Sequence, residues 1–300
     1  MGQPRRHVVC YGLITAAVVY YLKQDGVLDS ITAEHYVSNL RTPSLGLIDT
    51  AELVRRQKEG SFPSIGQMAP AVYLCALLGV LRVFLTDLVL VPLGRWAMAL
   101  ESRKSSKVII DRWTESCWRC LLYTVSVGVG VWCLQGKSWV PIWGSTIDCW
   151  KGWPLIEITY EIQVFYCMAG GLYLHLFFFQ WVDARRKDFF EMMSHHVCTI
   201  LAISFSYLTN FTRFGTLVLM VHDPTDAMLE YAKIFNYIRT YRGGLTVGYL
   251  ADLVFTLFSI TFFVTRFLAY ILGARASARA RASYLIWVRH DGLVLHHAPP

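Results

Sequence analysis

Two adjacent histidines, His195 and His196, lie within a long apolar stretch, and two acids, Asp223 and Asp226, lie within the next one. The histidines fall about two turns into a helix that is expected to start near Asp188. An ionisable side chain at membrane depth costs free energy, so its presence there indicates function. A histidine beside a carboxylate can act as a general base or as the nucleophile of an acyl transfer. Histidine and aspartate together can also bind a divalent metal, and the residues alone leave these alternatives open.

The number of histidines bears on whether these residues bind a metal. Those in or beside apolar stretches are His175, His195, His196 and His222. Membrane di-iron hydroxylases and desaturases use more histidines, arranged in spaced boxes, which argues against a di-iron centre here. We predict that no metal takes part, with a mononuclear site as the alternative.

The acids form a helical pattern in the segment "VHDPTDAMLEYAK". Asp223 and Asp226 are three residues apart, and Asp226 and Glu230 are four apart, so the carboxylates share one helical face. Pro224 fits the first turn of a helix that Asp223 would cap. In the alternative interpretation Asp223 only caps, Glu230 pairs with Lys233, and the face is solvated. Apolar sequence on both sides favours a membrane-embedded helix instead.

The composition is that of an integral membrane protein. Of the 300 residues, 55% are hydrophobic and 16% charged, and the mean hydropathy is +0.40. The net charge of +7 comes without long basic runs, which argues against nucleic-acid binding. Eight cysteines are too dilute for a disulfide scaffold, and the lone CxxC at Cys117 and Cys120 supports neither a zinc site nor a redox motif.

Apolar stretches long enough to cross a bilayer, about 20 residues each, recur along the chain. They predict an all-α, multi-pass transmembrane helical bundle with about six to seven spans. Residues 1–25 are expected to be a signal peptide or signal anchor, and residues 26–67 a polar juxtamembrane segment. The expected spans are 68–93, which is the first main transmembrane helix, 117–134, 158–182, 189–208, 214–238 and 246–272.

Basic residues in the short loops predict the orientation. The loops after the first, third and fifth spans carry these residues and are expected to be cytosolic. The tryptophan-rich loop 135–154 is then lumenal. The tail 273–300 conflicts with this scheme, because its arginines fall on the lumenal side. Either 189–238 does not make two full crossings or a last helix is missing, and we expect a truncated or mis-predicted C-terminus.

The stretch from Asp183 to Tyr237 closely resembles the Lag1 motif of ceramide synthases, which lies within the TLC domain of multi-pass membrane proteins. It contains the basic "RRKDF", the paired histidines, "SY" followed by Asn210 and Arg213, and "HD" followed by Asp226, "LE" and "AK". A weaker resemblance extends from "RWTESCWRCLLYT" onward, so the TLC domain is expected at 112–272 with the Lag1 motif at 183–237.

The resemblance implies a TLC fold and a sphingosine N-acyltransferase of the endoplasmic reticulum membrane. Such an enzyme joins a sphingoid base to a fatty acyl-CoA and makes (dihydro)ceramide, with acyl-CoA as co-substrate and no other cofactor. Carried over by position, His195, His196, Asp223 and Asp226 form the catalytic set. We assign the acyl contact to His196 and proton handling to the other three, although the sequence does not separate a base from an acyl-histidine nucleophile.

The resemblance also implies a set of substrate-binding residues. Basic residues at the cytosolic mouth would suit the CoA phosphates, with a topology signal as the equally good alternative. The predicted substrate-binding set is Arg185, Arg186, Lys187, Asn210, Arg213, His222, Glu230 and Lys233.

Two alternatives to an active synthase stay open. A non-catalytic TLC protein could bind lipids or escort cargo, and a truncated synthase could be inactive. A transporter would show inverted repeats, which are not evident. Homo- or hetero-dimerisation is also left open. Asn210 to Thr212 form a glycosylation sequon, close to the predicted membrane.

Overall fold

The computed structural model describes residues 63–100, 107–140, 146–149, 153, 156–183 and 187–269. The predicted N-terminal signal or anchor, nearly all of the juxtamembrane segment, and the basic tail therefore lie outside the described residues. Every regular element in the described residues is helical. The predicted all-α fold is thus confirmed.

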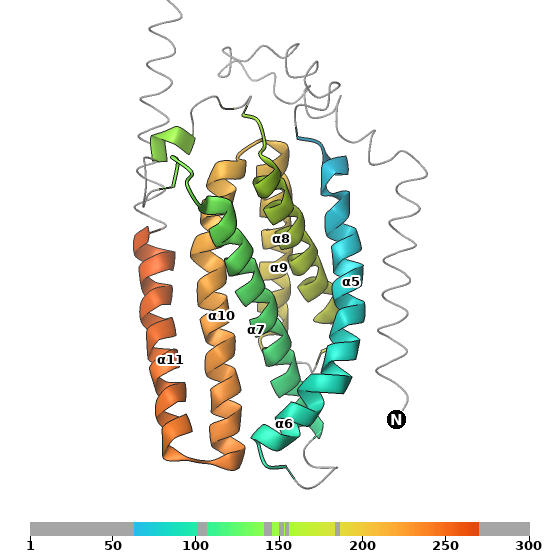
Figure 1. Ribbon diagram of the computed structural model, residues 1–300, viewed down its shortest axis with the longest axis vertical. Helices are drawn as coiled ribbons and strands as arrows, with labels where there is room; N and C mark the ends of the chain where they lie inside the picture. Colours follow the sequence, from blue (N-terminus) through green and yellow to red (C-terminus); the bar gives the residue numbers. More distant parts are fainter. Residues whose placement is uncertain are drawn as a thin grey trace, which may run out of the picture.

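Long helices run alternately up and down through the bundle (Figure 1). The first begins with the short helix η2 (Ile65–Met68), and a second short helix, η4, covers Thr146–Cys149. The remaining elements are α5 (Ala69–Leu85), η3 (Thr86–Leu90), α6 (Val91–Ala97), α7 (Lys107–Leu134), α8 (Tyr160–Phe179), α9 (Phe189–Leu208), α10 (Thr212–Arg242), α11 (Leu245–Phe263) and η5 (Val264–Ala269).

Four helical stretches among the described residues are long and apolar enough to cross a membrane. They are Ile65–Ala97, Lys107–Leu134, Tyr160–Phe179 and Leu245–Arg266. The chain is therefore a membrane protein. Helices α9 and α10, which carry the ionisable cluster, do not meet this composition, although they lie alongside the others in the bundle (Figure 1). The number of spans stays a prediction.

The packing of the helices separates a core from a lipid-facing surface. Helix α8 is apolar on all sides and packs against α5 and α9. Helices α5 and α11 instead expose large apolar side chains such as Leu77, Phe84 and Tyr249, as expected where acyl chains replace water. Helix α10 packs mainly on α7 and α11 and contacts α9 at few points. The side of α10 that faces α9 therefore has room for cavities.

One local prediction was wrong. Asp223 does not cap a helix, because α10 is continuous from Thr212 to Arg242 and Pro224 lies inside it. The missing proline N–H is tolerated in membrane helices because neighbouring helices and hydroxyl side chains satisfy the freed groups. Asp223 and Asp226 thus lie mid-helix, away from either end of α10.

The helix ends that flank the predicted cytosolic loops lie at one end of the bundle. Helix α6 ends and α7 begins there, α8 ends and α9 begins there, and the turn between α10 and α11 lies there too (Figure 1). These connections carry basic residues, whereas the turn between α9 and α10 lies at the opposite end. These basic ends therefore share one side of the bundle, and which side is cytosolic stays a prediction.

A glycine sets the close approach of α10 to α8 and α9. A Cβ added at Gly215 would clash with the Tyr166 hydroxyl and lie 2.9 Å from Ser206 Oγ. Tyr166 is fully buried, and its hydroxyl donates to the Thr212 carbonyl at 3.2 Å, so it cannot easily move. We expect Gly215→Ala to lower the free energy of unfolding by about 1–3 kcal/mol, measured by thermal unfolding in detergent.

Gly128 offers the matched control for this substitution. It lies inside α7, is exposed, and has no atom within 4 Å of an added Cβ. Gly128→Ala should leave stability unchanged or raise it slightly, because alanine is the better helix former. Equal losses for the two variants would contradict the proposed clash.

Candidate functional site

Two cavities meet beside the paired histidines. The first, about 410 Å³, extends from the α8–α9 linker to the histidines and is called here the polar cavity. The charged and imidazole side chains that line it are Arg119, Asp183, Asp188, His195, His196, Asp226, Glu230, Lys233 and Arg266.

The second cavity, about 460 Å³, extends from the same place toward the turn between α9 and α10 and is called here the apolar cavity. Helix α9 contributes Cys198, Thr199, Ala202, Ile203 and Ser206 to its wall, and the opposite wall is formed by Phe211, Phe214, Gly215, Val218, Leu219 and His222. The two cavities share His195, Asp226 and Arg266.

The two histidines occupy different positions at this junction. They lie on α9 with ring centroids 5.7 Å apart. His195 is exposed and lines both cavities, whereas His196 is buried and lines only the polar one. Adjacent residues on a helix point about 100° apart, so the two imidazoles meet a substrate from different sides. His195 is thus the histidine that a molecule spanning both cavities would contact.

Asp223 is fully buried, and its carboxylate accepts hydrogen bonds from two hydroxyl groups. Ser126 of α7 donates to one carboxylate oxygen at 2.5 Å, and Tyr173 of α8 donates to the other at 2.9 Å. The Tyr173 ring lies 6.3 Å from the ring of His196 and lines the apolar cavity. Asp223 therefore fixes the position of Tyr173, which had no signal in the sequence because it lies in an apolar run.

Asp226 faces the cavities and pairs with a cation from another helix. Its carboxylate accepts a hydrogen bond from Arg266 of η5 at 3.1 Å. Glu230, one turn further along α10, is buried and accepts from Lys233 at 2.6 Å. The pairing of Glu230 with Lys233, which belonged to the alternative interpretation, is present, but the burial of Asp223 and Glu230 excludes the solvated face of that interpretation.

The remaining predicted substrate-binding residues are spread over the bundle. His222 lines the apolar cavity, and its Nδ1 lies 2.8 Å from the Val218 carbonyl oxygen. Lys187 is exposed in the α8–α9 linker, and residues 185 and 186 lie outside the described residues. The structure thus brings His222, Glu230 and Lys233 to the histidines and leaves Lys187 near the outer end of the polar cavity.

Asn210 and Arg213 lie at the opposite end of the bundle, in or just after the turn between α9 and α10. Asn210 adopts a left-handed backbone with φ of 57° and donates from Nδ2 to the Ile156 carbonyl at 2.7 Å. Arg213 donates to the Asp148 carbonyl at 2.7 Å. These contacts join the turn to the segment that precedes α8. The structure therefore does not bring either residue to the histidines.

The position of Asn210 also bears on glycosylation. Its side chain is 1% exposed and Thr212 is fully buried, so a glycosyltransferase has no access to this sequon in the folded protein. It is the sole sequon of the chain. We expect a glycosidase to leave the electrophoretic mobility of the protein expressed in animal cells unchanged. A shift would show that this turn is open when the sequon meets the transferase.

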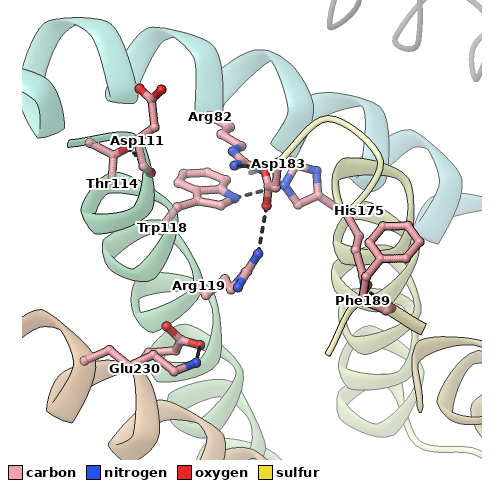
Figure 2. A network of polar contacts seen from close by, with 11 residues as sticks. Arg82, Asp111, Thr114, Trp118, Arg119, His175, Asp183, Phe189 and Glu230 are labelled. Atoms are coloured by element: carbon pink, nitrogen blue, oxygen red, sulfur yellow. Dashed lines mark hydrogen bonds and ion pairs between the residues drawn. The ribbon is translucent and has the colours of Figure 1, made fainter. Parts of the chain in front are cut away.

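An ionic cluster closes the outer end of the polar cavity. Asp183 lies between Arg82 of α5 and Arg119 of α7 and pairs with both, with Arg119 at 2.8 Å (Figure 2). Burial alone would raise the pKa of the Asp183 carboxyl, but the two guanidinium groups hold that pKa below its usual range. The neighbouring Trp118 donates to His175 Nε2 at 2.9 Å. This cluster ties the α8–α9 linker to two other helices.

The cations that line the polar cavity are paired with acids within it. Its cations Arg119, Lys233 and Arg266 pair with Asp183, Glu230 and Asp226, respectively. Among the described residues, no three His, Cys, Asp or Glu side chains come together as a metal site would require. A site with imidazoles between a polar and an apolar cavity suits the transfer of an apolar group from a polar carrier.

The comparisons with known proteins agree on one family. The profile of the TLC domain matches residues 112–291. Human ceramide synthase 5 is 36% identical over 157 residues, which cover 52% of this chain and 38% of that protein. Rice ASC1-like protein 3 is 32% identical over 72% of this chain and 73% of its own length. Ceramide synthase LOH2 of Arabidopsis thaliana is 30% identical over 76% of each. The chain thus spans well under half of the human relative and most of the two plant relatives.

Proposed function

The chain belongs to the ceramide synthases of the TLC domain family, and from that premise we propose that it transfers the acyl group of a fatty acyl-CoA to the amine of a sphingoid base. The amide product is a ceramide or dihydroceramide. The observation that carries this proposal is the position of His195, which lines both a polar and an apolar cavity. An acyl-CoA has the same division, with its thioester between a polar carrier and an apolar chain.

In the reaction, the amine nitrogen forms a bond to the thioester carbonyl carbon and the carbon–sulfur bond breaks. The amine gives up a proton, and CoA leaves as the thiol. A histidine either accepts the amine proton or first takes the acyl group itself and passes it to the amine. The location of His195 favours this residue for the contact with the acyl group. His196, beside Tyr173, then accepts and donates protons. These roles are the reverse of those assigned to the two histidines from the sequence.

The charges of the polar cavity bear on where the CoA would bind. Since its three cations already have carboxylate partners, the phosphates of CoA have little to gain by entering. We place the phosphates outside the cavity, near Lys187 and the basic residues before it, and the thioester end of the carrier inside. The sphingoid amine then meets the thioester near Asp226, where a carboxylate stabilises its ammonium form before the proton is lost.

The apolar cavity is the proposed site of the acyl chain. Along α10 it extends from His222 to Phe211, which is about 16 Å at 1.5 Å per residue. Ala202 lines this cavity about two turns of α9 beyond His195, so a large side chain there would shorten the space. We expect Ala202→Trp to shift the ceramides formed from mixed acyl-CoAs toward shorter acyl chains, as measured by mass spectrometry.

The neighbouring Leu201 provides a matched control for chain selection. It is 63% exposed and does not line either cavity. Leu201→Trp should leave the product distribution unchanged, because its side chain points away from the cavity. The same shift in both variants would contradict the placement of the acyl chain.

The proposed function has a direct test. Membranes containing the chain would be incubated with sphinganine and acyl-CoAs of several chain lengths, and the ceramides measured by mass spectrometry. We expect amide formation that requires both substrates. We also propose that the protein lies in the endoplasmic reticulum, and microscopy of the tagged chain should find it there. Absence of product from folded, well-expressed protein would favour the lipid-binding or cargo-escort alternative.

A further inference from the structure

The two cavities share three residues, His195, Asp226 and Arg266. Of these three, Arg266 lies outside the Lag1 motif. It lies in the π-helical segment η5, directly after α11, and lines both cavities together with His195 and Asp226. A π-helical turn within a longer helix is often a functional feature. A cation in an otherwise apolar membrane helix is also costly and usually marks a functional position.

The contacts of Arg266 leave part of its guanidinium free. One terminal nitrogen donates to Asp226 at 3.1 Å and lies 3.5 Å from Thr225 Oγ1. The Nε–H group is enclosed by the protein and has no hydrogen-bond partner among the described residues. The other terminal nitrogen, Nη1, makes no hydrogen bond among these residues either. Because the side chain is 18% exposed and lines both cavities, a ligand atom can complete this donor.

The chemistry of acyl transfer supplies such an atom. When a nucleophile adds to the thioester carbonyl carbon, the carbonyl oxygen becomes negatively charged, whether the nucleophile is an imidazole or the amine itself. When the carbon–sulfur bond breaks, the oxygen's electron pair re-forms the carbonyl double bond, and the sulfur leaves with the electrons of the broken bond and takes up the proton that the amine gave up. A fixed cationic donor that binds this oxygen lowers the barrier, and it does so most strongly in a site that excludes water.

From the proposed function and this geometry, we infer that Arg266 is a catalytic residue that stabilises the oxyanion of the acyl-transfer intermediate. Asp226 holds the guanidinium in place through one terminal nitrogen, and the other terminal nitrogen donates to the reacting oxygen. In this arrangement Arg266 of η5 contacts the oxygen of the thioester carbonyl, and His195 of α9 contacts its carbon. The inference deepens the proposed function and depends on it.

Arg266→Lys separates this role from a purely structural one. Lysine keeps the positive charge and can still pair with Asp226, but it lacks the planar fork with its second terminal nitrogen. We expect the variant to unfold at the same temperature as the unaltered protein, to keep KM for acyl-CoA within about twofold, and to lose about 10²-fold in kcat.

Arg239 supplies the matched control. It also joins α10 to α11, through an exposed pair with Asp252 at 2.7 Å. Arg239→Lys should keep kcat, KM and the unfolding temperature. An Arg266→Lys protein with normal turnover would overturn the inference while ceramide formation by the unaltered protein stands. An unaltered protein that forms no ceramide would instead refute the proposed function, and the inference with it.

Discussion

His195→Ala is expected to reduce ceramide formation by about 10³-fold, since His195 is the imidazole proposed to contact the acyl group. As a nucleophile it carries the acyl group, while His196 accepts the amine proton. The residue is exposed at the surface of α9 and lines both cavities, so its loss should not unfold the protein. The measurement is ceramide formed per amount of folded protein, with sphinganine and acyl-CoA both saturating.

Ser194→Ala is the control for this experiment, because Ser194 is the exposed neighbour on the same helix and lines neither cavity. It should retain full activity. His196→Ala separates the roles of the two histidines. Incubation with radiolabelled acyl-CoA alone should leave label on the protein in His196→Ala but not in His195→Ala if His195 carries the acyl group. Full activity in both alanine variants would remove the histidines from the chemistry.

The acids and histidines of this site could be predicted from the sequence because they lie on two consecutive helices. Helical spacing alone puts Asp226 and Glu230 on one face, and the motif pairs them with His195 and His196. Their partners could not be predicted in this way. Ser126, Tyr173 and Arg266 come from other helices, and no periodicity tells which helices pack side by side. The structure therefore adds the groups that hold the predicted residues in place.

The errors of the sequence-based prediction have local causes. Asp223 followed by Pro224 has the composition of a helix start, but tertiary packing keeps α10 continuous through the proline. Helix α7 begins at Lys107, whereas the apolar pattern begins at Cys117. Its polar first turns are nevertheless partly buried, with Trp113 and Glu115 facing the bundle. Hydropathy finds the lipid-facing surface well and misses polar side chains that face a protein interior.

The ionic cluster at Asp183 illustrates what lies beyond such patterns. Asp183 and Arg82 are 101 residues apart, and Arg119 comes from a third segment. Each charge alone would be unfavourable in this buried position, and together they satisfy one another (Figure 2). The cluster forms only when α5, α7 and the α8–α9 linker have assembled, so disrupting it should lower the stability of the assembled bundle.

Asp183→Asn is expected to destabilise the protein by about 3–5 kcal/mol, because it leaves two buried guanidinium groups without a counter-charge. The side chains of Arg82 and Arg119 are only 12% and 19% exposed, so water cannot replace the carboxylate. In detergent, the midpoint of thermal unfolding should fall by roughly 10 °C. Asp252→Asn, which breaks the exposed pair with Arg239, should change the stability by no more than about 1 kcal/mol.

A second substitution tests the cause of this loss. Arg82→Gln in the Asp183→Asn background removes one of the two uncompensated charges, so the double variant should be more stable than Asp183→Asn alone. If the double variant is no more stable, the loss comes from packing rather than charge. The cluster also fixes the linker that leads into α9. Asp183→Asn protein that remains folded should therefore show a raised KM for acyl-CoA, since the outer end of the polar cavity is no longer held against α5 and α7.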